Sequence, residues 1–146
     1  MDRVPSMNRA WSALAVIVLF GAPGCGSDEP FDYIQVQGTV TYEDGTPLPA
    51  SGLQLVFESQ DVKPVGDLHP LPGKASVDAS GAFSQVTSHK FGDGLVPGKH
   101  KVSLAYATDH QGKLLVPEEY THPSTTPLVV DTATLPLVIK VPKPTP

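Results

Sequence analysis

Apolar and polar residues alternate in short runs from Tyr33 onward, which is the pattern of half-buried β-strands. In the first run, 33–42, the residues on the apolar face are Ile34, Val36, Val40 and Tyr42. Gly38 falls on this face without a side chain, which predicts a bulge or a close crossing of another strand. The pair Asp44-Gly45 then predicts a tight turn that ends the strand.

Similar alternation recurs in later segments, which are separated by residues typical of turns. Strands are predicted at 53–59, 75–77, 82–86, 99–106, 127–132 and 136–141. Val86 breaks the alternation set by Phe83, so a bulge or the end of a strand is expected between them. The core is expected to rest on aliphatic side chains together with Phe57, Phe83 and Tyr106. Segment 60–72 has three prolines and no period, and is predicted as a long loop.

The fold class follows from these short strands. Sixteen prolines and thirteen glycines suit turn-rich β structure and disfavour a helical protein. We predict an all-β protein, a single seven-stranded β-sandwich over residues 33–142, with a disordered proline-rich tail at 143–146. The 146 residues suffice for one such domain and a processing segment.

The N-terminal segment, 1–24, has the pattern of a signal peptide. Arg3 and Arg9 give a positive start, and the uncharged stretch 10–22 is too short to span a membrane comfortably. We therefore expect a signal helix that is removed on export. The only tryptophan, Trp11, lies within it.

Ala22, Pro23 and Gly24 precede Cys25, the only cysteine of the chain. This stretch resembles the lipobox of bacterial lipoproteins. The resemblance implies that Cys25 becomes the lipidated first residue of the mature protein and that the partner there is a membrane. The alternatives are an ordinary signal peptide with an incidental cysteine and an uncleaved N-terminal anchor. Residues 25–32 are expected to form a polar tether. In the sorting rule of enteric bacteria, the residue after the lipidated cysteine determines the destination, and Gly26 there, in place of aspartate, favours the outer membrane.

Composition excludes several classes of function. The net charge is −5 and no basic cluster is present, so we expect no nucleic-acid partner. One cysteine cannot form an internal disulfide. No metal site is predicted, because the five histidines form no zinc-ligand pair and the acidic clusters do not follow a calcium-binding loop. The histidines are interpreted as solvated, with His100 facing outward, and no cofactor is expected.

Several motifs within Ile34–Val141 resemble one family. They are the strand Val36-x-Gly38-x-Val40 with its Asp44-Gly45 turn, the hairpin "VDASGAFS", the stretch "VPGKHKVSL" and the late loop "PEEYTHPSTTPLVV". In order and spacing they resemble the carboxypeptidase regulatory-like domain, a transthyretin-like Greek-key sandwich. The resemblance implies a secreted binding or structural domain and no reaction. The hydroxyisourate hydrolases of this fold have a Tyr-Arg-Gly-Ser tail, which this chain lacks.

The long segment 107–127 holds the candidate ligand contacts. Tyr120, with Glu118, Glu119 and His122 around it, is either a contact residue or a side chain that packs onto the sandwich. We expect a non-enzymatic, lipid-anchored envelope protein that binds an envelope protein or glycan through such loops. The alternative is a structural subunit that associates through sheet edges. A transthyretin-like hydrolase is the third hypothesis.

Overall fold

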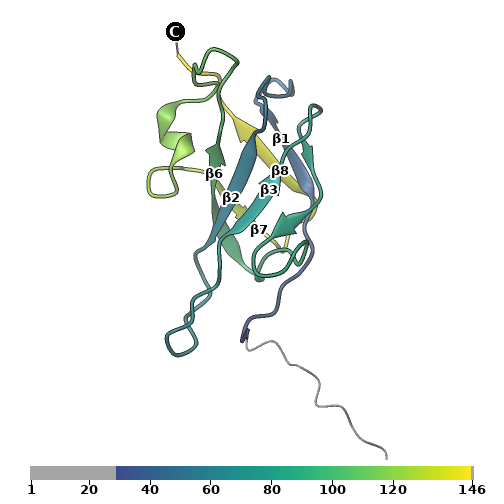
Figure 1. The fold of residues 1–146 in the computed structure, drawn as a ribbon, viewed down its shortest axis with the longest axis vertical. Coiled ribbons are helices and arrows are strands. Elements are labelled where there is room, and N and C mark those ends of the chain that lie inside the picture. Colours follow the sequence, from purple (N-terminus) through teal and green to yellow (C-terminus); the bar gives the residue numbers. More distant parts are fainter. Residues whose placement is uncertain (1–28, 146) are drawn as a thin grey trace, which may run out of the picture.

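A computed structural model describes residues 29–145 and confirms the all-β sandwich (Figure 1). The described residues contain no α-helix and one short 3-10 helix, η1 at Glu118–Thr121. The strands are β1 Gly38–Tyr42, β2 Gln54–Ser59, β3 Gly73–Ser76, β4 Ala82–Phe83, β5 Val86–Thr87, β6 Lys99–Ala105, β7 Val129–Asp131 and β8 Leu137–Val141.

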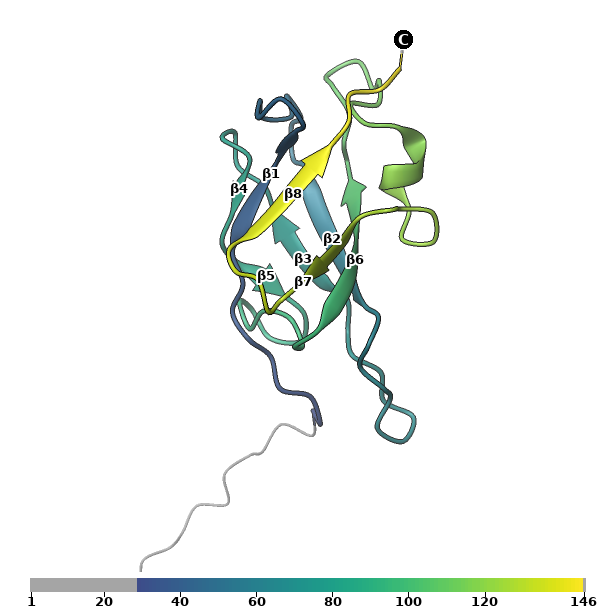
Figure 2. The ribbon, with the colours of Figure 1, turned by 180° about the vertical axis from the view of Figure 1, so that it is seen from behind.

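The strands form two sheets with the core between them (Figure 2). One sheet has the order β4-β1-β8, and the other has the order β5-β3-β2-β6-β7. The first and last strands of the chain, β1 and β8, pair in parallel, whereas the other strand pairs are antiparallel. The fully buried Leu55 and Phe57 of β2 face inward with Val102 and Leu104 of β6, as the alternation predicts.

The structure has eight strands where the sequence predicts seven. The difference lies in segment 82–87, which the sequence presents as one strand. Phe83 pairs with Gly38 in the three-stranded sheet, whereas Val86 pairs with Ala75 in the five-stranded sheet. The strand therefore ends between Phe83 and Val86, at the break in alternation, because the chain crosses there from one sheet to the other.

The two sheets meet through an aromatic contact. The rings of Phe57 and Phe83 lie 5.9 Å apart between centroids, and both side chains are buried. The prediction that Tyr106 completes this core is wrong, because Tyr106 is 70% exposed. Strand β6 ends at Ala105, and the positive φ of Tyr106 (57°) turns its side chain outward. Ala107 and Val116 contribute to the core from the following loop.

Gly38 is a close crossing, as the sequence predicts. A Cβ atom on Gly38 would lie 2.1 Å from the carbonyl oxygen of Leu137 in β8. The parallel pairing of β1 with β8 therefore requires a residue without a side chain at this position.

Both ends of the described chain are attached to the sandwich. The predicted tether is shorter than 25–32, because Phe31 is buried and Ile34 exchanges two backbone hydrogen bonds with Leu95. At the other end, the first residue of the predicted tail is held: Lys143 Nζ lies 2.7 Å from Asp44 Oδ2 and 5.3 Å from the centre of the Tyr42 ring.

Replacing Gly38 with alanine should lower the free energy of unfolding by about 3 kcal/mol, because the new methyl group overlaps the backbone of β8. Gly112→Ala is the control, since no atom lies within 4 Å of a Cβ there and only its positive φ (80°) is strained; its cost should be about 1 kcal/mol. Urea unfolding followed by circular dichroism measures both. Equal losses would mean that the contact with Leu137 is unimportant.

Candidate functional site

The late loop carries the four predicted contact residues on and beside η1. Pro117 precedes the 3-10 turn, and its carbonyl accepts a hydrogen bond from the Tyr120 N–H at 3.0 Å. Thr125 Oγ1 donates to the Glu119 carbonyl at 2.8 Å, which folds the segment after η1 back onto it. The loop is thus ordered by its own hydrogen bonds.

Three of the four predicted residues share one shallow hollow. Its volume is about 410 Å³, and it is lined by Pro117, Glu118, Glu119, His122 and Thr125. Glu118, Glu119 and His122 are exposed. Tyr120 does not line the hollow: it is partly buried and packs against the core cluster. The structure therefore favours the packing interpretation for Tyr120.

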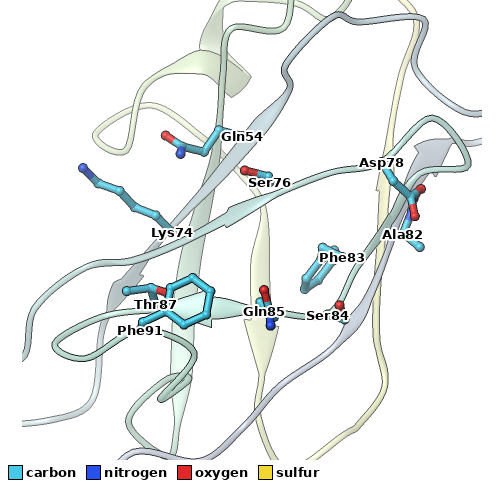
Figure 3. Close-up of a pocket in the computed structure, with 10 residues that line it drawn as sticks. All are labelled: Gln54, Lys74, Ser76, Asp78, Ala82, Phe83, Ser84, Gln85, Thr87 and Phe91. Atoms are coloured by element: carbon cyan, nitrogen blue, oxygen red, sulfur yellow. Dashed lines mark hydrogen bonds between the residues drawn. The ribbon is translucent and has the colours of Figure 1, made fainter.

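A second hollow of about 340 Å³ lies where the chain crosses between the sheets (Figure 3). Lys74 and Ser76 of β3 line it with Ser84 and Gln85 of the crossing. Phe91, which is 82% exposed, borders it from the loop after β5. Amide, hydroxyl and ammonium groups beside an open aromatic ring suit a ligand with several hydroxyl groups.

Sequence reasoning missed this second hollow. Apart from the buried Phe83, its strand residues occupy outward positions, so each is interpreted as a solvent-facing residue when taken alone. Only the pairing of β2 with β3 and of β3 with β5 brings Gln54, Ser76 and Thr87 to one face. One sequence feature could have pointed to this hollow: Phe91 is an aromatic residue within a polar, glycine-containing loop, "SHKFGDG".

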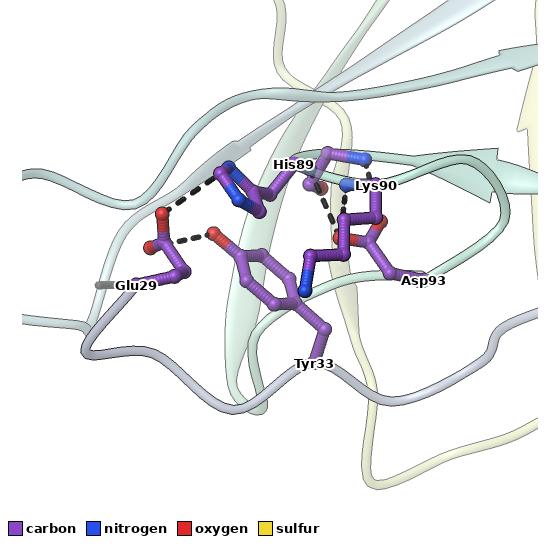
Figure 4. A network of polar contacts seen from close by, with 6 residues as sticks. Glu29, Tyr33, His89, Lys90 and Asp93 are labelled. Carbon is purple, nitrogen blue, oxygen red and sulfur yellow. Dashed lines mark hydrogen bonds and ion pairs between the residues drawn. The ribbon is translucent and has the colours of Figure 1, made fainter. Parts of the chain in front are cut away.

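Residues 29–34, at the start of the described chain, join the sandwich through a polar network (Figure 4). Tyr33 donates its hydroxyl hydrogen to Glu29 Oε1 at 3.0 Å, and His89 Nδ1 lies 3.3 Å from Glu29 Oε2. Burial and the hydrogen bond to Glu29 raise the pKa of Tyr33 to about 12. The predicted signal segment 1–24, Cys25 and the next three residues lie outside the described part of the chain.

Asp93 organises the loop beside this network. Its carboxylate accepts hydrogen bonds from the backbone N–H groups of Ser88, His89 and Lys90 at 2.7–3.0 Å. Burial raises the pKa of Asp93, but these hydrogen bonds to the charged form outweigh it and lower the pKa below the ordinary value. Asp44 and Asp93 therefore stabilise turns, as expected for aspartates that precede glycine.

The prediction that His100 faces solvent is wrong. The side chain is 2% exposed, because period two places it on the same face of β6 as Val102 and Leu104. Nε2 donates to the Val96 carbonyl at 2.8 Å, since a carbonyl oxygen only accepts. Burial lowers the pKa of His100, although the hydrogen bond to Val96 opposes this shift.

Residues 29–145 contain no group of three or more potential metal-ligating side chains. The same residues include no helix with the length and apolar character needed to cross a bilayer. In comparisons with known proteins, no family model, no curated protein and no solved structure matches the chain. The candidate sites therefore depend on the geometry of this chain alone.

The burial of His100 predicts a pH-dependent stability. In the unfolded chain His100 binds a proton near the ordinary histidine pKa of 6.5, whereas in the folded chain burial lowers this pKa and the proton binds only at lower pH. The free energy of unfolding should therefore fall as the pH drops below 6.5, with a slope of at most about 1.4 kcal/mol per pH unit from this group.

Urea unfolding between neutral and mildly acidic pH measures this slope. His100→Gln should flatten the slope, because glutamine keeps an N–H donor but does not titrate. His69→Gln, at an exposed position, is the matched control and should leave the slope unchanged. An equal slope in the His100 variant would assign the pH dependence to other groups.

Proposed function

We propose that this protein is a non-enzymatic, lipid-anchored protein of the bacterial cell envelope that presents a binding surface for an envelope protein or glycan. Cys25 carries the lipid, in the outer membrane, and the β-sandwich is the display scaffold. The lipid anchor is supported by the placement of the chain's only cysteine directly after the apolar segment. Two or more acyl chains give a stable attachment without a membrane-spanning helix.

The observation that carries the proposal is the placement of the chain's N-terminal side relative to the late loop. Residues 29–34 join the sandwich at one end, and η1 lies toward the other end (Figure 1). If the membrane is attached through Cys25, η1 and the hollow beside it lie toward the end of the sandwich that is farther from the membrane. A rigid two-sheet scaffold thus separates the attachment point from a surface formed by ordered loops.

The lining of this hollow indicates what it binds. Glu118 and Glu119 supply negative charge, while His122 and Thr125 supply groups that both donate and accept hydrogen bonds. Amine-bearing or hydroxyl-rich surfaces match this set, as found on envelope proteins and glycans. The second hollow, with Phe91 at its border, offers a further hydroxyl-binding surface on the same scaffold.

The structural-subunit alternative receives less support. Strand β8 is the edge of the three-stranded sheet, and Val138 on it is 63% exposed, which favours edge-to-edge association. Lys140 is also exposed on this strand, and a lysine on an edge strand opposes such pairing. The opposite edge, β4, has only two residues.

Replacing Cys25 with serine should release the protein from the membrane fraction and leave unprocessed precursor, because the acyl-transfer chemistry needs the thiol. Ser27→Ala is the matched control, since it changes a neighbouring hydroxyl and keeps the thiol. Fractionation and mass spectrometry of the N-terminus measure both variants. Unchanged fractionation and processing of the Cys25 variant would overturn the anchor.

Binding through the late loop should be lost when its exposed polar groups are removed together. The variant combines Glu118→Gln, Glu119→Gln and His122→Ala, and we expect at least about a tenfold weaker association. Glu43→Gln, an exposed carboxylate outside the hollow, is the control. The probes are purified peptidoglycan sacculi and crosslinking to envelope proteins in intact cells. Equal binding by the triple variant in both assays would exclude this hollow.

A further inference from the structure

The loop between β2 and β3 forms a projecting arm, which we define as residues 60–72. Val65 and Leu68 exchange two backbone hydrogen bonds, at 2.9 and 3.1 Å, around a two-residue turn. Gly66, with a φ of 62°, supplies the left-handed conformation that this turn needs. The arm extends beyond the sandwich at the end where residues 29–34 join it, in both views (Figures 1 and 2).

The arm exposes large apolar side chains. Val65 is 52% exposed, Leu68 is 51% exposed and Leu71 is 45% exposed. Prolines at 64, 70 and 72 restrict the backbone on both sides of the turn, so these side chains are presented by a stiffened segment. Scattered exposed apolar residues are ordinary, but three within seven residues on one projection indicate a contact surface.

Residues 29–33 are fixed beside the base of this arm. Glu29 is held by Tyr33 and His89, and the backbone of Leu71 lies close enough to the Tyr33 hydroxyl to lower its pKa slightly against the larger effect of burial. Only three residues separate Glu29 from Cys25. Four extended residue steps reach at most about 14 Å, so Cys25 cannot lie farther than this from Glu29.

We infer that the 60–72 arm is a second, non-covalent contact with the bilayer in which the lipid of Cys25 is embedded. This inference depends on the proposed lipid anchor. Val65 and Leu68 enter the interface between headgroups and acyl chains, while Asp67 in the turn keeps its carboxylate among the headgroups. Because the arm is held near the membrane by the anchor, a weak contact is sufficient for occupancy.

The charges near the arm determine which bilayer it prefers. On the arm, Asp61 and Asp67 are exposed with one lysine, Lys63. Asp32, near the start of the described chain, is also exposed. Excess negative charge opposes a strongly anionic surface. Zwitterionic phosphatidylethanolamine is therefore the favoured headgroup.

The chain offers a direct optical test, since its only tryptophan is Trp11 in the predicted signal segment. Leu68→Trp then introduces the single tryptophan of the lipidated protein. The full chain is produced in a bacterium that processes lipoproteins and reconstituted into phosphatidylethanolamine-rich vesicles with or without brominated acyl chains. We expect at least about a twofold loss of emission in the brominated vesicles, from insertion to the acyl boundary.

Tyr106→Trp is the matched control, because Tyr106 is also exposed and follows β6 at the opposite end (Figure 1). Its emission should change little. Val65→Trp repeats the test at the facing position of the arm. Unquenched Leu68→Trp and Val65→Trp emission in protein with a verified lipid mass would overturn the membrane contact, and so would equal quenching of Tyr106→Trp.

Failure of the anchor itself is recognised separately. A chain with native Leu68 that still emits tryptophan fluorescence retains Trp11, and a missing lipid mass at Cys25 confirms that processing failed. That result would overturn the proposed function and, with it, the inference. Adding phosphatidylglycerol should reduce the quenching of Leu68→Trp, as the excess negative charge requires.

Discussion

The pairing of β1 with β8 is the interaction on which the rest of the fold depends. It joins the first and last strands of the chain in parallel, and β1 is the only neighbour of β8 in its sheet. The two backbones lie in contact at Gly38, where no side chain fits. The buried faces of both strands close one side of the core. Because the partners are almost a hundred residues apart, this sheet forms only after most of the chain has been made.

Much of this fold was predictable from alternation, because a residue's face in a strand depends on nothing beyond its neighbours. Leu55, Phe57, Val102 and Leu104 are buried as predicted. Alternation does not reveal where a strand ends. Tyr106 fits the inward pattern of β6 but lies one residue past its end, and a positive φ turns it outward. Conversely, the polarity of His100 suggests that its side chain faces solvent, but its position in the alternation of β6 places it in the buried face.

The candidate sites were harder to predict, since they depend on tertiary contacts between distant segments. The hollow beside η1 could be predicted in part, because Glu118, Glu119 and His122 lie within five residues of one another in the sequence. The hollow at Phe91 combines residues from β2, β3, the crossing and the following loop. The polar network at Glu29 could likewise not be predicted from the sequence, because residues 26–30 have the composition of a solvated spacer. Its partners, Tyr33 and His89, come together only after the sandwich has formed.

The attachment of residues 29–34 to the sandwich also has a consequence for a pull on the N-terminal side of the chain. If the protein is anchored as proposed, a pull from the membrane reaches Glu29 and Phe31 before it reaches β1. The next resistance is the pair of hydrogen bonds between Ile34 and Leu95, at 2.8 and 2.9 Å. These contacts precede β1 in the chain, so a pull from the N-terminal side would load them before it loads the pairing of β1 with β8. In the proposed envelope lipoprotein, residues 29–34 would therefore take up strain before the strand pairs of the sandwich do.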